Sequence, residues 1–140
     1  MAEIKDNLLY TKTHQWYDPE SGKVGITDHA QDQLGEIVYV ELLWDDGLAG
    51  TEVSAVTYDG DEPASDPIDD ISVESQKAVG DIYAPLSGEI TSVNEDLMDE
   101  PEKVNEDPYG EGWLFTLDPS DFDGEKGNLL DAAAYKAFCE

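Results

Sequence analysis

The sequence predicts a mainly β protein, built as a sandwich or flattened barrel with short helices and a C-terminal helix. Three observations favour this fold class. Short runs of β-branched and aromatic residues recur along the 140 residues, turn-forming residues separate them, and no repeat of roughly 20–50 residues is present. A chain of this length has room for one core, so we expect residues 1–140 to form a single domain.

The first part of the chain predicts two strands followed by a short helix. Leu8 to Trp16 and Lys23 to Ile26 carry the strand patterns, and a turn that contains Pro and Gly separates them. Thr27 or Asp28 can cap the helix that follows, because a short side chain with an oxygen accepts hydrogen bonds from the free N–H groups at a helix start. Gly35 ends this helix, since glycine adopts the backbone conformation of a C-cap without strain.

The middle of the chain predicts a strand, a loop and a hairpin. Residues 36–42 are β-branched and aromatic and give the clearest strand signal. From residue 57 to residue 70 the apolar periodicity is lost and acidic residues accumulate, which indicates an exposed acidic loop. Ile71 to Glu74 and Ile82 to Ala84 then predict the two strands of a hairpin that spans residues 71–84, with its turn at residues 75–78.

The last part predicts two more strands and two helices. Glu89 to Val93 is expected to form a strand after a turn, and Asn94 is expected to cap a helix over residues 95–98. Trp113 to Leu117 predicts the final strand. The alanine-rich segment over residues 128–138 predicts the C-terminal helix, because alanine has the highest helix propensity.

The charge balance is extreme. The chain has 34 acidic residues against 7 basic ones, all lysine, which gives a net charge of −27. Such a field repels phosphate groups and anionic lipids, so we expect neither a nucleic acid nor a membrane as partner. The acids are spread along the whole chain, which favours a solvated surface, and a surface this negative suits a salt-rich cytoplasm. We therefore hypothesise a halophilic source.

The sequence carries no signal for export or for an enzyme active site. It has no apolar run long enough for a membrane helix and no apolar core of a signal peptide near Met1, so we expect a cytoplasmic protein. Dinucleotide, calcium-loop and serine-hydrolase motifs are all incomplete. His14 and His29 are far apart in the sequence and have no cysteine partner beside them, so we expect no zinc site. Cys139 is the only cysteine, which excludes an internal disulfide.

Lys77 lies in the predicted turn of the hairpin and is one of only seven cations. A solvated turn lysine accounts for its position. A lysine held out for modification is the alternative, because an ε-amine on a flexible stem can be acylated. The residues alone leave both readings open.

The segment around Lys77 resembles the lipoyl-lysine hairpin of the glycine cleavage system H proteins, and its central residues are Val73-Glu74-Ser75-Gln76-Lys77-Ala78-Val79-Gly80-Asp81. Three further blocks resemble the same family in the same order. They are Tyr10-Thr11-Lys12-Thr13-His14-Gln15-Trp16, Val24-Gly25-Ile26-Thr27-Asp28-His29-Ala30-Gln31 and Val104-Asn105-Glu106-Asp107-Pro108-Tyr109-Gly110-Glu111-Gly112-Trp113. Four ordered blocks make a specific resemblance, which extends over about residues 8 to 138.

This resemblance implies the flattened hybrid barrel of biotinyl and lipoyl carriers and an amide between lipoate and Lys77. It implies a carrier and not an enzyme. Glycine decarboxylase with pyridoxal phosphate would load an aminomethyl group, the aminomethyltransferase would pass its carbon to tetrahydrofolate, and dihydrolipoamide dehydrogenase would reoxidise the arm. A lipoate-attaching ligase or transferase would modify Lys77. Glu74 and Asp81 would flank the site for recognition, and Gly88 would give the return turn its backbone freedom.

The chain departs from the family pattern at three places. Gln76 replaces the usual apolar residue before the lysine. Gln15 stands where the family usually has Glu, and its neutral amide would hold a cationic amine less strongly than a carboxylate does. Residues 57–70 resemble an insertion. Two rival interpretations stay open, a related carrier used mainly in lipoate biosynthesis and an acidic binding module whose lysine is never modified. A biotinyl domain is disfavoured, because Gln76 and Ala78 stand where methionines flank a biotinyl lysine.

Overall fold

The computed structural model describes residues 5–42, 52–56, 58–59, 62–63 and 71–139. The strands in chain order are β1 (Leu9–Tyr10), β2 (Gln15–Tyr17), β3 (Lys23–Ile26), β4 (Ile37–Leu42), β5 (Glu52–Val53), β6 (Tyr58–Asp59), β7 (Glu62–Pro63), β8 (Ile71–Ser75), β9 (Val79–Asp81), β10 (Gly88–Val93) and β11 (Phe115–Pro119). The helices are α1 (Asp28–Leu34), α2 (Asp96–Asp99), α3 (Lys103–Glu106), α4 (Phe122–Glu125), the 3-10 helix η1 (Lys126–Asn128) and α5 (Ala132–Cys139). The predicted mainly β fold class with short helices and a C-terminal helix is confirmed.

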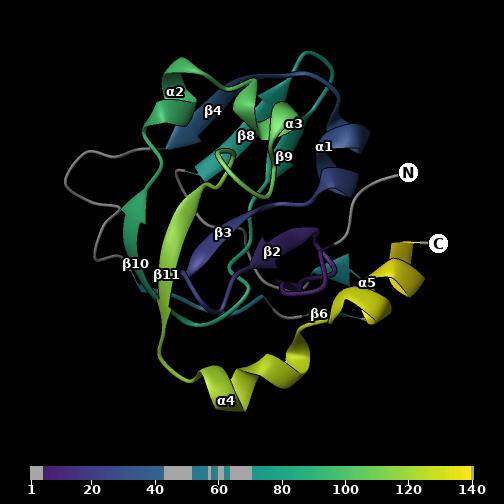
Figure 1. Cartoon of the computed structure of the whole chain (residues 1–140), viewed down its shortest axis with the longest axis vertical. Helices are drawn as coiled ribbons and strands as arrows, with labels where there is room; N and C mark the ends of the chain where they lie inside the picture. Colours follow the sequence, from purple (N-terminus) through teal and green to yellow (C-terminus); the bar gives the residue numbers. More distant parts are fainter. Residues whose placement is uncertain (1–4, 43–51, 57, 60–61, 64–70, 140) are drawn as a thin grey trace.

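Two antiparallel sheets form the body of the protein (Figure 1). The larger has the strand order β1-β2-β3-β11-β10-β5 and the smaller the order β4-β8-β9. Alternate residues along β8 and β10 are buried, as the two-residue period of a strand requires when one face packs on a core. Val40, Val73 and Ile90 from both sheets meet in that core. No helix among the described residues is long and apolar enough to cross a membrane.

The prediction of one strand from Leu8 to Trp16 is wrong, because a tight turn divides it into β1 and β2. Thr11 and Gln15 close the turn, with the Thr11 N–H donating to the Gln15 carbonyl at 2.9 Å. His14 has φ +68°, a left-handed conformation that is uncommon for a residue other than glycine. This conformation reverses the chain without any glycine, so the sequence showed no turn signal there.

The prediction of the helix from its caps is confirmed. The Thr27 hydroxyl accepts a hydrogen bond from the Ala30 N–H at 3.1 Å. Thr27 is therefore the N-cap, and Asp28 is the first residue of α1. Gly35 ends α1 with φ +87°. The strand predicted over residues 36–42 is β4.

The hairpin of β8 and β9 has its turn where it was predicted, but its return strand was placed too late. Val73 pairs with Gly80 and Glu74 pairs with Val79, so the chain re-enters the sheet directly after the turn. Ile82 and Ala84 were predicted to form this strand because they are apolar. They are buried, but they follow β9 and lie outside any strand.

The segment 57–70 was predicted to be an irregular loop, but part of it is regular. Two of its short stretches, β6 and β7, pair as an antiparallel ribbon. Residues 57, 60–61 and 64–70 lie outside the described residues, so the expected loop is not described further.

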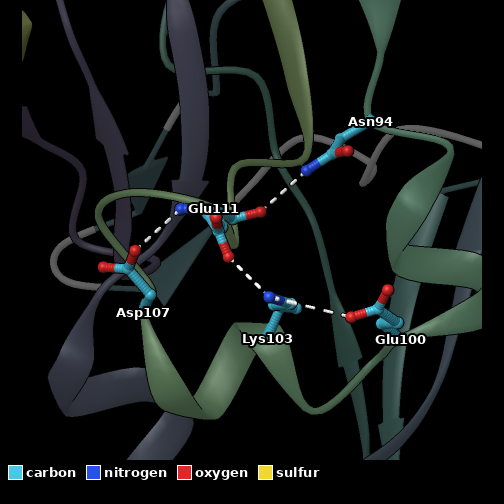
Figure 2. Close-up of polar contacts among 5 residues, drawn as sticks. All are labelled: Asn94, Glu100, Lys103, Asp107 and Glu111. Atoms are coloured by element: carbon cyan, nitrogen blue, oxygen red, sulfur yellow. Dashed lines mark hydrogen bonds and ion pairs between the residues drawn. The ribbon is translucent and has the colours of Figure 1, made fainter.

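Asn94 does not cap α2 with its side chain, contrary to the prediction. Its amide instead donates to the backbone carbonyls of Glu111 and Trp113 at 2.8 and 2.9 Å. The Glu111 carboxylate also pairs with Lys103 of α3, with 2.6 Å between oxygen and nitrogen. Figure 2 shows how these side chains lie. Lys103 lies 3.7 Å from Glu100, so this small network fastens α3 to the turn before β11.

The C-terminal helix begins later than residue 128. Residues 126–128 form η1, and Leu130 then pairs with Tyr10 through two backbone hydrogen bonds of 2.7 and 2.8 Å. Ala132 to Cys139 form α5. The ring of Tyr135 in this helix stacks on the Tyr10 ring, with 4.5 Å between the ring centroids. This pairing fixes α5 against the first strand.

Gly88 is a packing glycine, and the expectation that it gives a turn its backbone freedom is wrong. It begins β10 and its backbone has no positive φ. A Cβ atom at this position would overlap the carbonyl oxygen of Asp118 in β11. The close approach of β10 to β11 therefore requires the absence of a side chain.

We expect Gly88→Ala to lower the free energy of unfolding by about 2 kcal/mol or more, because backbone atoms of β11 must move to admit the methyl group. Gly127→Ala is the matched control, since nothing lies within 4 Å of its added methyl group. The control should change the free energy of unfolding by about 0.5 kcal/mol at most. Urea unfolding of both variants measures the difference, and equal effects would contradict the close-packing role.

Candidate functional site

The tip of the β8–β9 hairpin is a two-residue turn that the Ser75 side chain braces. The buried Ser75 hydroxyl accepts hydrogen bonds from the N–H groups of Lys77 at 3.3 Å and Ala78 at 3.1 Å. The Ser75 N–H donates to the Ala78 carbonyl at 2.9 Å. These bonds hold the backbone of Lys77 in place, so its root is fixed.

The Lys77 side chain is exposed at this tip. Its ammonium group makes no hydrogen bond or ion pair within the described part of the chain. Lys103 and Lys126, by comparison, pair with carboxylates at 2.6 and 3.6 Å. The structure therefore presents Lys77 as an accessible amine on a rigid base, which can be acylated without first breaking an ion pair.

The hairpin rests against the C-terminal end of α1 (Figure 1). A Cβ atom on Gly80 would lie 3.0 Å from the Leu34 side chain, so β9 and α1 are in close contact. A Cβ atom on Gly35 would lie 3.5 Å from Cε of Lys77. The lysine stem thus leans over the glycine that ends α1, which leaves room for it.

A groove of about 210 Å³ lies beside the hairpin. Its walls come from the β1–β2 turn, from α1 and from the hairpin, and they include Thr13, His14, Gln15, Ile26, Leu34, Val73, Gly80, Asp81 and Ile82. Apolar side chains supply much of this lining, and the polar residues come from the β1–β2 turn, from Gln33 of α1 and from Asp81. The groove can therefore receive an apolar chain with a polar end.

The Gln15 amide forms part of the polar end of this groove and is held by its neighbours. Its oxygen accepts from the Thr13 hydroxyl and from the Tyr83 N–H at 3.3 Å. Its nitrogen donates to the Thr13 carbonyl at 2.8 Å. Gln15 is buried. Its amide is neutral and therefore presents no charge to the groove.

The two acids predicted to flank the site lie on the outward face of the hairpin strands, and Asp81 also lines the groove. Glu74 and Asp81 are both exposed, one on each strand. Glu74 lies between Tyr39 of β4 and Val79 of β9 in the strand register. Tyr39 is 50% exposed and Val79 is 59% exposed, so an apolar surface accompanies the acids next to Lys77.

The expectation that His14 and His29 lie apart without a cysteine is wrong. The folded chain brings both rings together with Cys139, and their candidate ligand atoms all lie within 4.8 Å of one another. Burial, and then the neighbouring His29, lower the pKa of His14 to about 4. The Tyr135 hydroxyl contacts His14 Nδ1 and the Thr27 hydroxyl, each at 2.7 Å, and burial raises the pKa of this phenol.

Comparison with known proteins finds one family. The model of the family described as "Glycine cleavage H-protein" matches residues 8–140. The glycine cleavage system H protein of Deinococcus radiodurans is 51% identical over 137 residues, which cover 98% of this chain and 98% of that protein. That of Thermotoga maritima is 49% identical over 132 residues, covering 93% and 94%. A crystal structure of the H protein from Mycobacterium marinum is 34% identical, has a TM-score of 0.73 and covers 96% of this chain and 97% of that one.

We expect Ser75→Ala to destabilise the hairpin tip by about 1 kcal/mol, because the N–H groups of Lys77 and Ala78 lose the hydroxyl that accepts from them. Ser72→Ala is the matched control on the same strand, where the hydroxyl makes one bond of 3.3 Å to Glu41. Amide hydrogen exchange at Lys77 and Ala78 should accelerate in Ser75→Ala and stay unchanged in Ser72→Ala. Unchanged exchange in both variants would show that the hydroxyl does not hold the turn.

Proposed function

The chain belongs to the glycine cleavage H-protein family, and on that premise we propose that it is the lipoyl carrier of the glycine cleavage system, with Lys77 as the attachment residue. The observation that carries this proposal is the exposed amine at the tip of the turn that Ser75 braces. A rigid root below a flexible stem suits an amine that must be acylated and then swing between partners. When bound, the lipoyl group supplies the disulfide that takes up a one-carbon amine unit and electrons. The chain itself supplies position and access, which is the role of a carrier and not of an enzyme.

The groove beside the hairpin supports this role. Ile26, Leu34 and Val73 give it apolar walls, which favour a hydrocarbon chain over water. Gln15 offers a neutral amide at the polar end, and its oxygen already accepts hydrogen bonds from Thr13 and Tyr83. A cationic amine in this groove would therefore be held less strongly than by a carboxylate at the same place.

The outward face of the hairpin is the surface we propose for partner recognition. Glu74 and Asp81 supply charge there, and Tyr39 and Val79 supply apolar area. The partners of the proposal are glycine decarboxylase, the aminomethyltransferase, dihydrolipoamide dehydrogenase and a lipoate-attaching ligase or transferase. All of them must approach the same lysine. A chain of net charge −27 is repelled by nucleic acids and anionic membranes, and we propose that it works in the cytoplasm.

Lys77→Arg is the direct test of the attachment residue. The variant keeps the charge but replaces the amine with a guanidinium that a lipoate ligase does not acylate. We expect no lipoylation, no glycine cleavage in a reconstituted system, and a free energy of unfolding within about 0.5 kcal/mol of the parent, because the side chain is exposed. Tandem mass spectrometry of the parent locates the adduct, and an adduct on Lys12, Lys23 or any other lysine would refute the assignment.

The double variant Gln76→Lys with Lys77→Gln is the control for the position of the amine. It keeps the composition and the charge and moves the amine by one residue along the same turn. Most lipoylation should be lost, because the turn then presents the amine in another direction. Full modification at position 76 would show that the ligase does not read the geometry of the turn.

We further propose that the surface is adapted to high salt, as its net charge suggests. Screening of mutual repulsion should raise the free energy of unfolding between about 0.1 M and about 1 M KCl by on the order of 1 kcal/mol or more, since the Debye length falls from about 10 Å to about 3 Å. Removal of two exposed charges by Glu95→Gln with Asp99→Asn should reduce this increment. Thermal unfolding of both proteins across a KCl series gives the comparison. A stability that does not depend on salt would exclude the adaptation.

A further inference from the structure

Three side chains with metal-binding chemistry meet beside the groove, and the proposed carrier role uses none of them as a metal ligand. His14 comes from the β1–β2 turn, His29 from α1 and Cys139 from the end of α5. All three are half-buried, and their ligand atoms lie within 4.8 Å of one another. The two imidazole rings are 4.7 Å apart between centroids. Three distant segments of the chain thus converge on one small volume.

The donor set is specific in its chemistry. Imidazole nitrogen and thiolate sulfur are the ligands that Zn²⁺ and related transition metals prefer, whereas Ca²⁺ and Mg²⁺ prefer oxygen. Around a tetrahedral zinc ion, such donors lie about 3.3–3.8 Å from one another. Small side-chain rotations bring atoms that are at most 4.8 Å apart to these separations. Two histidines and one cysteine fill three positions and leave the fourth open.

The surroundings of His14 favour the same assignment. Its Nδ1 lies 2.7 Å from the Tyr135 hydroxyl, which leaves Nε2 as the ligand atom. A metal on Nε2 requires the proton on Nδ1, where it donates to the Tyr135 oxygen, and such a partner fixes the ring of a ligating histidine. The Tyr135 hydroxyl is in turn bonded to Thr27 at 2.7 Å. His14 also has a left-handed backbone, which is uncommon for a residue other than glycine.

We propose that His14, His29 and Cys139 bind a divalent transition-metal ion of the zinc type. The Cys139 thiol gives up its proton to the solvent when the metal–sulfur bond forms, and no electron is transferred. The fourth position holds water or a small ligand. His14 also lines the groove beside the hairpin, so the ion lies next to that groove.

Titration of the reduced, metal-free full-length protein with Zn²⁺ in a calorimeter tests the site. We expect one ion per chain and a higher midpoint of thermal unfolding when zinc is bound, because the ion binds the folded chain. Titration with Co²⁺ should give a thiolate-to-cobalt charge-transfer band in the near ultraviolet. This band reports on the sulfur ligand independently of affinity.

Cys139→Ser and His29→Gln should each weaken Zn²⁺ binding by roughly 100-fold or more, and the first should also abolish the charge-transfer band. Asp32→Asn is the matched control, because it removes an exposed carboxylate one turn further along α1 and leaves the three ligands intact. Its affinity should stay within about twofold of the parent, as surface changes outside a site have small effects. Equal binding by the parent and Cys139→Ser would assign the zinc to the acidic surface and overturn the proposal.

Lys77→Arg separates this site from the proposed lipoyl group, whose reduced form would also carry thiols. Zinc binding and the cobalt band should be unchanged in this variant, because no ligand of the cluster is altered. Loss of both signals in Lys77→Arg would assign the metal to the arm and refute the cluster. Their retention supports the cluster even if Lys77 proves not to be lipoylated.

Discussion

The hydroxyl of Tyr135 joins three segments on which the candidate site depends. It contacts His14 in the β1–β2 turn and Thr27 at the start of α1, each at 2.7 Å, from a position on α5. The Thr27 oxygen also caps α1, and the end of that helix packs on Gly80 of the hairpin and on the stem of Lys77. The groove has walls from the same turn and the same helix. The Tyr135 side chain is buried and must keep such partners, because an unsatisfied buried hydroxyl would cost about 1–3 kcal/mol. One hydrogen-bonded group therefore fixes the relative positions of the turn, the helix and the groove.

The sequence predicts the parts of this fold that local interactions decide. Thr27 and Gly35 mark the ends of α1 because capping is a matter of a few neighbouring backbone groups. The β-branched residues of β4 identify that strand for a similar reason. The place of Lys77 in a turn is also local, since strands on both sides demand a reversal. The resemblance to the H proteins then supplied what composition could not, the chemistry expected of that lysine.

The sequence does not predict what depends on contacts between distant residues. Asn94 has the composition of a helix cap, but the carbonyls of Glu111 and Trp113 compete for its amide. The His14 turn contains no glycine, and its left-handed backbone is stabilised by partners on α1 and α5. The meeting of His14, His29 and Cys139 requires the chain to bring its last helix back to its first strand, which no spacing of residues reveals. In each case contacts between distant residues override or add to the local preference of the sequence.

On a surface this acidic, many carboxylates are available to pair with the ammonium group of Lys77. With 34 acids for 7 lysines, a lysine has many carboxylates within reach, and Lys103 and Lys126 are each paired. Lys77 lies between Glu74 and Asp81 in the sequence, yet those acids stand on the outward face of the strands while the lysine stem leans over Gly35. An amine paired with a carboxylate would cost more to acylate, since the pairing favours its charged form over the neutral form that reacts. A tight turn that keeps the amine away from its own neighbouring acids removes that cost, and it does so through backbone geometry alone.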